Sequence, residues 1–175
     1  CPHVETLNLT INNSTSSTTT ATACDSYTWS SNGQTYSATG SYTNTTTNAA
    51  GCPHVETLNL TINASTSNTT QATACDSYTW SVNGMTYSQS GTYTNTSTNA
   101  AGCPHVETLN LTINASTSNT TNATACGSYT WAVNGMTYTA SGTYTNNGTN
   151  AAGCPHVETL NLTITTSSTN TTTVS

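Results

Sequence analysis

The chain has no lysine and no arginine among its 175 residues. Proteins that bind nucleic acid neutralise its phosphates with these two side chains, so the composition excludes nucleic acid as a partner. Attraction to an anionic membrane surface depends on the same cations and is excluded for the same reason. A chain without them also offers no cleavage site to trypsin-like proteases.

Other groups are scarce as well. Phenylalanine is absent, the only acids are six Asp and Glu residues, and no apolar run is long enough to cross a membrane. Charged residues usually make up about a quarter or more of a soluble protein's surface, so the few charged side chains here cannot keep the surface hydrated. We expect covalent glycans to do so, with no other cofactor.

There is no signal peptide, but we expect the chain to be a piece of a longer array, so this does not argue against secretion.

What the sequence does contain is a strict repeat. The motif Cys-Pro-His-Val-Glu-Thr-Leu-Asn-Leu-Thr-Ile begins at Cys1, Cys52, Cys103 and Cys154, a period of 51 residues. Such a period predicts tandem structural units, which build length more readily than one catalytic pocket. We expect residues 1–23 to be the C-terminal strand segment of an upstream repeat unit, followed by units at 24–74, 75–125 and 126–175.

Threonine, serine and asparagine supply 90 of the 175 residues, a bias typical of glycan-bearing stalks. A disordered mucin-like chain would be rich in proline and poor in aromatic residues. Here each repeat carries one Trp, three Tyr and two Cys. The composition therefore favours ordered repeats.

Alternating polarity predicts a strand at residues 55–62. Leu58, Leu60 and Ile62 fall on one face, whereas Asn59 and Thr61 fall on the other. The following Ser/Thr/Asn-rich stretch, 64–74, is either a loop or an exposed edge strand.

A hairpin is predicted farther along the repeat, where Asn83-Gly84 separates two β-prone segments. With a two-residue turn there, Trp80 lies opposite Tyr87. A further short strand is expected at 91–94, and no helix is expected anywhere. The fold class predicted from these five or so strands per repeat is all-β, with small immunoglobulin-like β-sandwich repeats of 51 residues joined end to end.

Two cysteines per repeat indicate a disulfide framework. Two schemes respect the period: Cys24–Cys52, Cys75–Cys103 and Cys126–Cys154, or Cys1–Cys24, Cys52–Cys75 and Cys103–Cys126. We favour the first, because it encloses the aromatic residues and leaves Cys1 to pair with an upstream repeat. No Cys-x-x-Cys pair is present, so we expect no metal site.

Fifteen of the 22 asparagines lie in Asn-x-Ser/Thr sequons, which accept N-linked sugars in secreted proteins. On the predicted strand, Asn59 and Thr61 share the polar face, so a glycan there would point to solvent. The threonine and serine runs 14–20, 43–47 and 165–173 are either O-glycosylated or plain β-edge and loop segments. The candidate glycosylation sites are Asn8, Asn12, Asn13, Asn44, Asn59, Asn63, Asn68, Asn95, Asn110, Asn114, Asn119, Asn122, Asn147, Asn161 and Asn170.

A His-x-Glu pair recurs in each motif, as at His54 and Glu56. Residues two apart share a strand face, so we expect a charge-assisted hydrogen bond in each pair. A catalytic role would need a nucleophile or second acid nearby, and the sequence offers none. We therefore expect no enzyme activity. The tryptophans, Trp29, Trp80 and Trp131, either form the core or stack on sugars, and we favour the core.

Several motifs together resemble tandem repeats of large secreted bacterial surface proteins and adhesin stalks. They are Cys-Asp-Ser-Tyr-Thr-Trp, Asn-Gly-x-Thr-Tyr, Ser-Gly-Thr-Tyr-Thr, Gly-Cys and Thr-Leu-Asn-Leu-Thr-Ile. The sequence departs from the pattern at Gly127, where the other repeats have Asp25 and Asp76. In composition and period the chain also resembles the protein cores of glycan-coated extracellular fibrils. The resemblance implies extracellular display and a structural or adhesive role.

We expect a structural extracellular fibre protein, sugar-coated, whose partners are further copies of itself and attached carbohydrate. The alternative is an adhesin stalk or carbohydrate-binding repeat module that presents a binding domain outside this sequence. Ice binding through threonine arrays is a weaker third hypothesis, because Trp, Tyr and sequons interrupt such arrays in the sequence.

Overall fold

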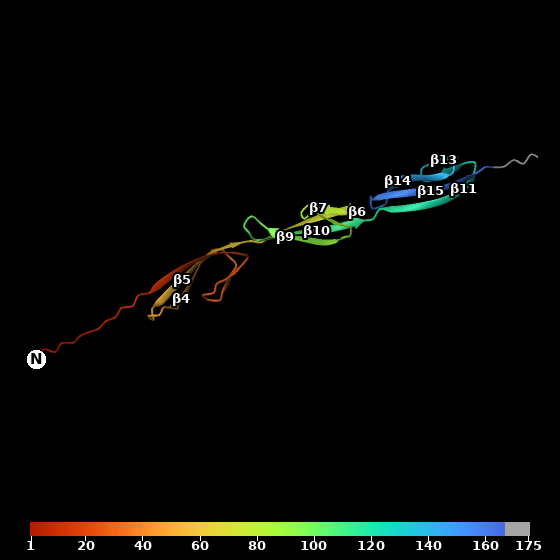
Figure 1. Ribbon diagram of the computed structural model, residues 1–175. Coiled ribbons are helices and arrows are strands. Elements are labelled where there is room, and N and C mark those ends of the chain that lie inside the picture. The colour runs from red at the N-terminus through yellow and green to blue at the C-terminus, as the bar shows by residue number, and fades with distance from the viewer. Residues whose placement is uncertain (167–175) are drawn as a thin grey trace, which may run out of the picture. The chain divides into compact units, whose positions relative to one another are not determined.

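The computed structural model describes residues 1–166, and the regular structure in this range is entirely β (Figure 1). No helix occurs there, which confirms the all-β class. In particular, this part of the chain has no helix that is long and apolar enough to cross a membrane.

The strands form three similar sets of five, and we call each set a module. The first module contains β1 (Thr15–Cys24), β2 (Tyr27–Thr28), β3 (Thr35–Tyr36), β4 (Gly40–Thr47) and β5 (Pro53–Asn63). The second contains β6 (Thr66–Cys75), β7 (Tyr78–Trp80), β8 (Met85–Tyr87), β9 (Gly91–Thr98) and β10 (Pro104–Asn114). The third contains β11 (Thr117–Cys126), β12 (Tyr129–Trp131), β13 (Met136–Tyr138), β14 (Gly142–Thr149) and β15 (Pro155–Thr165).

Each module combines a three-stranded sheet with a two-stranded hairpin. In the first sheet the order is β1-β5-β4, and β2 pairs with β3 separately. The central strand β5 runs parallel to β1, with Thr15 level with His54, and antiparallel to β4, with Tyr42 level with Leu58. The repeated motif therefore supplies the middle strand of every sheet, where both of its edges are hydrogen-bonded.

The expected immunoglobulin-like sandwich needs a correction. Such a fold packs two sheets of antiparallel strands with about seven strands in all, whereas each module here has five strands and one parallel pair. A strand that pairs in parallel with another 39 residues later, repeatedly along the chain, is a feature of a β-solenoid. Parallel pairing needs a long crossover connection, and here that connection contains the hairpin and β4.

The sheets also place the module boundaries differently from the expected units. The expected boundary leaves residues 15–23 in an upstream repeat unit, but β1 pairs along its whole length with β5. The polar stretch after each motif is thus an edge strand that opens the next module. Of the two alternatives for residues 64–74, the edge strand is confirmed for all but the first two residues, since β6 begins at Thr66.

The hairpin register differs from the prediction as well. Trp80 lies level with Met85, and Tyr78 lies level with Tyr87, so the connecting loop has four residues. The type I′ two-residue turn that Asn-Gly favours needs positive φ at both central positions, but only Gly84 has it, with φ of 70°. The Asn83 side chain instead accepts a hydrogen bond from the Met85 amide and donates one to the Tyr87 hydroxyl, at 3.0 and 2.9 Å.

A small core lies between each hairpin and its sheet. In the first module Trp29 packs against Leu58 and Leu60, with Tyr27, Tyr36, Tyr42, Ala21 and Ile62 around them. The same positions form the other two cores. The predicted strand face of Leu58, Leu60 and Ile62 and the core role of the tryptophans are confirmed.

The chain divides into two compact units, residues 1–68 with 95–107 and residues 69–94 with 108–175. The first unit contains the first module and the beginning of β10. The second contains the third module and the hairpin β7–β8.

Candidate functional site: the disulfide junction

Two disulfides are present, one in each compact unit. Cys24 bonds to Cys103 and Cys75 bonds to Cys154, both across 79 residues. Neither predicted scheme contains these pairs, so the favoured Cys24–Cys52 pairing is corrected. Cys1, Cys52 and Cys126 are unpaired in the described part of the chain.

The parallel pairing of β1 with β5 explains the observed connectivity. Cys24 ends β1 and lies level with Asn63, at the far end of β5. Cys52 directly precedes β5, at its other end. About ten strand residues separate the two ends, roughly 30 Å, whereas disulfide-bonded Cα atoms lie within about 7 Å of each other. Cys24 therefore bonds to Cys103, which precedes β10 in the next module and lies beside the end of β5.

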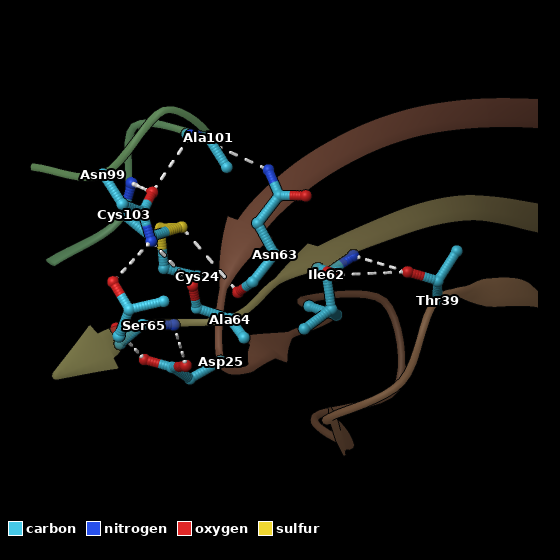
Figure 2. The surroundings of a disulfide bond; sticks show 11 residues. Cys24, Asp25, Thr39, Ile62, Asn63, Ala64, Ser65, Asn99, Ala101 and Cys103 are labelled. Atoms are coloured by element: carbon cyan, nitrogen blue, oxygen red, sulfur yellow. Dashed lines mark hydrogen bonds between the residues drawn. A yellow bond between two sulfur atoms is a disulfide. The ribbon is translucent and has the colours of Figure 1, made fainter. Parts of the chain in front are cut away.

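An asparagine-centred turn holds Cys103 at this junction (Figure 2). The Asn99 side-chain oxygen accepts hydrogen bonds from the amides of Ala101 and Cys103, both at 3.0 Å. Its Nδ2 donates to the carbonyl oxygen of Ala64, at 2.9 Å. The turn thus fixes the cysteine against the two-residue linker between β5 and β6. Asn48 and Asn150 make the same contacts in the other modules.

Asp25 secures the linker from the other side (Figure 2). Its backbone is left-handed, with φ of 61°, and its amide donates to the carbonyl oxygen of Asn63 at 2.9 Å. The carboxylate accepts hydrogen bonds from the Ser65 hydroxyl and amide, at 2.6 and 2.8 Å. These two bonds hold the pKa of Asp25 below its ordinary value, the hydroxyl having the larger effect.

The same geometry explains why a glycine can replace the aspartate at position 127. Gly127 occupies the position of Asp25 and Asp76 and has φ of 79°. Aspartate and asparagine tolerate this left-handed conformation better than most residues, and glycine adopts it without strain. The position therefore requires a left-handed backbone conformation in every module. An aspartate there adds side-chain hydrogen bonds to the linker.

The expected histidine–glutamate hydrogen bond is confirmed in two of the motifs. Nε2 of His105 lies 3.0 Å from Oε1 of Glu107, and the equivalent pair His156 and Glu158 has the same distance. This bond is the main reason that the pKa values of Glu107 and Glu158 lie below the ordinary range. In the first module, Glu56 instead accepts hydrogen bonds from Ser31 and Asn44, which lower its pKa.

The outward face of each three-stranded sheet is a lattice of hydroxyl and amide groups. In the third module Asn161, on the central strand, donates to Oδ1 of Asn122 and accepts from the Thr143 hydroxyl, both at 3.0 Å. Together with Thr124 and Thr163, these residues line a shallow depression of about 350 Å³. In residues 1–166 no group of three or more His, Cys, Asp or Glu side chains could hold a metal ion.

The sequon asparagines fall into different environments. Asn59 is exposed on the outward face, as its strand position predicts. Other sequon side chains donate their Nδ2 hydrogens within the protein, where that nitrogen would have to carry the sugar. These are Asn12, Asn44, Asn63, Asn68, Asn119 and Asn161. Asn170 lies outside the described residues, and occupancy at every site remains a prediction.

Sequence reasoning missed the three junction asparagines, because none of them lies in a sequon. Each begins an Asn-Ala-Ala-Gly-Cys segment, and an asparagine side chain that bonds amides two and four residues later is a known turn former. This local signal could have located the turn. It could not have located its contact with the linker, which lies 35 residues earlier.

No protein-family model matches this chain, and a search of curated proteins finds none that is significantly similar to it.

Proposed function

We propose that this protein is a structural component of an extracellular fibre, built of β modules that are disulfide-linked to their neighbours and coated with glycans. The observation that carries the proposal is the Cys24–Cys103 bond, which joins the end of one module to the beginning of the next module's central strand. A bond of this kind holds consecutive modules together.

The two disulfides also support an oxidising location, such as the outside of a cell. In the chain-entropy estimate, closing a loop of this length stabilises the folded state by about 4–5 kcal/mol. This is substantial for modules whose cores each contain one buried tryptophan and two buried leucines.

Glycans would supply the hydration that six acids and no cations cannot. The outward face is mostly polar, with Val55 as an exposed apolar side chain, and carries the exposed Asn59 on its central strand. A sugar on this face would not disturb the core, which lies on the opposite face.

A carbohydrate-binding stalk is the second candidate, favoured by the polar depression around Asn161. Its hydroxyl and amide groups could bind sugar hydroxyls. Because the tryptophans are buried, no indole is available to stack on a sugar ring there.

Electron microscopy of the secreted protein, with intact mass before and after deglycosylation, tests the first proposal. We expect fibres whose mass falls to that of the bare polypeptide after the sugars are removed. A dispersed protein with the bare mass from the outset, and with affinity for a defined oligosaccharide, would support the second candidate instead.

A further inference from the structure

In two of the modules a histidine lies between a glutamate of its own strand and a threonine of an earlier strand. In the second module, Oγ1 of Thr66 lies 2.7 Å from Nδ1 of His105, and Nε2 of His105 lies 3.0 Å from Oε1 of Glu107. The third module repeats both distances. This arrangement is not visible in the sequence, because the threonine and the histidine are 39 residues apart.

The hydrogen bonds determine which nitrogen of His105 carries the proton. The ionised Glu107 can only accept, so Nε2 is the protonated nitrogen. The neutral imidazole then has an unprotonated Nδ1, which accepts the hydroxyl hydrogen of Thr66. A nucleophile, a base and a carboxylate that orients the base are therefore in contact, in the order of a hydroxyl–histidine–carboxylate triad.

The hydroxyl is open to solvent, whereas the base and the carboxylate are partly shielded. Thr66 is exposed at the beginning of β6, but the side chains of His105 and Glu107 are only 24% and 19% exposed. Oε2 of Glu107 also accepts a hydrogen bond from Nδ2 of Asn68, at 3.1 Å. A small molecule in solution can thus reach a threonine whose base is held in one orientation.

The junction asparagine adds a hydrogen-bond donor beside the hydroxyl. Nδ2 of Asn99 donates one hydrogen to the linker carbonyl at 2.9 Å and lies 3.3 Å from Oγ1 of Thr66. Its second hydrogen is therefore close to the position where an oxyanion would develop if Thr66 attacked a carbonyl group. Asn150 stands in the same relation to Thr117 in the third module.

We propose that Thr66 and Thr117 are acyl-acceptor sites, whose hydroxyl groups take the acyl group of a carboxylic ester. Oγ1 of Thr66 forms a bond to the carbonyl carbon while Nδ1 of His105 removes the hydroxyl proton. The bond from that carbon to the alcohol oxygen then breaks, and the alcohol leaves with the proton from His105. The products are an O-acyl threonine and a free alcohol, with no oxidation or reduction. This activity does not depend on the proposed fibre function.

The first module provides a natural comparison. Nδ1 of His54 lies 2.7 Å from the Thr15 hydroxyl, as in the other modules, but Nε2 faces the Ser17 hydroxyl at 3.3 Å. The glutamate of this module bonds to other side chains. A serine hydroxyl donates or accepts, so it does not hold the histidine in the form that a base needs. We expect Thr15 to accept acyl groups at least several-fold more slowly than the other two threonines.

Acetylation by p-nitrophenyl acetate tests the proposal in the full-length oxidised protein, after its free thiols have been capped with iodoacetamide. No lysine competes for the acetyl group. Reduction and cleavage after the glutamates separate the three threonines into peptides 6–56, 57–107 and 108–158. Mass spectrometry then measures the acetylation rate at each residue. We expect Thr66 and Thr117 to react faster than Thr15 and faster than the other exposed threonines of their peptides.

His105→Gln removes the base of one site only. We expect it to slow acetylation of Thr66 by about 100-fold or more, with Thr117 in the same chain unchanged. His156→Gln should give the opposite pattern. If a variant does not fold, the comparison of the three threonines in the wild-type protein still decides. Equal rates at Thr15, Thr66 and Thr117, or an unchanged rate at Thr66 in His105→Gln, would overturn the proposal.

Glu107 acts through His105, so its test also measures the imidazole tautomer. Nitrogen-15 NMR of the neutral imidazole should show the proton on Nε2 in the wild-type protein. In Glu107→Gln the new amide can donate to Nε2, so we expect part of the population to carry the proton on Nδ1 and Thr66 to react more slowly. An unchanged tautomer or an unchanged rate would contradict this positioning role.

Discussion

At the scale of single residues, the same leucine of the repeated motif is exposed in one copy and buried in another. Leu7 and Leu58 occupy the same place in the repeated motif, yet only Leu58 is buried against a tryptophan. In each module this leucine is buried because a tryptophan packs against its face of the three-stranded sheet.

Alanine substitutions at these two leucines measure that difference. Leu58→Ala should destabilise the first module by about 2–5 kcal/mol, because it removes a fully buried side chain and leaves a cavity. Leu7→Ala should change stability by less than about 0.5 kcal/mol in the monomer, since the side chain is exposed. Urea unfolding followed by tryptophan fluorescence checks both values, and equal effects would contradict the assignment.

Acid should weaken the junctions. The pKa values of Asp25, Asp76, Glu107 and Glu158 all lie below their ordinary range, so ionised carboxylates stabilise the folded state. This contribution is complete above the unfolded-state pKa values and disappears as the pH falls through the folded-state values. The urea midpoint should therefore be level near pH 7 and fall below about pH 4.

Asp76→Asn provides the control for this pH dependence. Asparagine tolerates the left-handed backbone and keeps an oxygen that can accept from the Ser116 amide, but it does not titrate. We expect a shallower fall of the urea midpoint in acid. An unchanged pH profile in this variant would show that Asp76 does not contribute.

At the scale of the elements, local patterns were predictable and pairings were not. Alternation of Leu58, Leu60 and Ile62 with polar residues correctly predicted a strand and its buried face. The parallel partner β1 was not predictable, since it is a polar edge strand whose threonines give no inward-facing pattern. The four-residue hairpin loop was missed because Asn-Gly also fits a longer loop in which only the glycine has positive φ.

Alanine substitutions at two glycines show which position needs a positive φ and which does not. Gly84 has φ of 70°, and no atom lies within 4 Å of the position that a Cβ would occupy, so Gly84→Ala should cost about 1–2 kcal/mol from backbone strain alone. Gly148 lies inside β14, also with free space around it, but without positive φ. Gly148→Ala should stabilise by about 0.4–1 kcal/mol. Thermal unfolding of the two variants should shift in opposite directions, and shifts of the same sign would contradict the loop geometry.

At the scale of the whole molecule, the repeat predicted tandem all-β modules, but the disulfide connectivity depended on the sheet topology. The two bonds enclose overlapping loops, because Cys75 lies between Cys24 and Cys103 in the sequence. A covalent path from Cys24 to Cys154 therefore runs through Cys103, back along the chain to Cys75, and across the second bond.

This path limits how far the protein can be stretched. It contains only the chain from Cys75 to Cys103, a separation of 28 residues that extends to roughly 100 Å, whereas the reduced chain from Cys24 to Cys154 extends to roughly 450 Å. Single-molecule force measurements should show this several-fold difference in contour length on adding a reductant. The same contour length in both states would mean that the overlapping bonds are absent.

The most direct test of the account is the disulfide connectivity of the protein isolated without reductant. Cleavage after the four glutamates alone yields peptides 6–56, 57–107 and 108–158, each with two cysteines. The observed pairing joins the first to the second and the second to the third. Mass spectrometry without reductant should therefore detect all three peptides as one linked species, which separates on reduction. Three separate peptides, each closed by its own internal disulfide, would contradict the account.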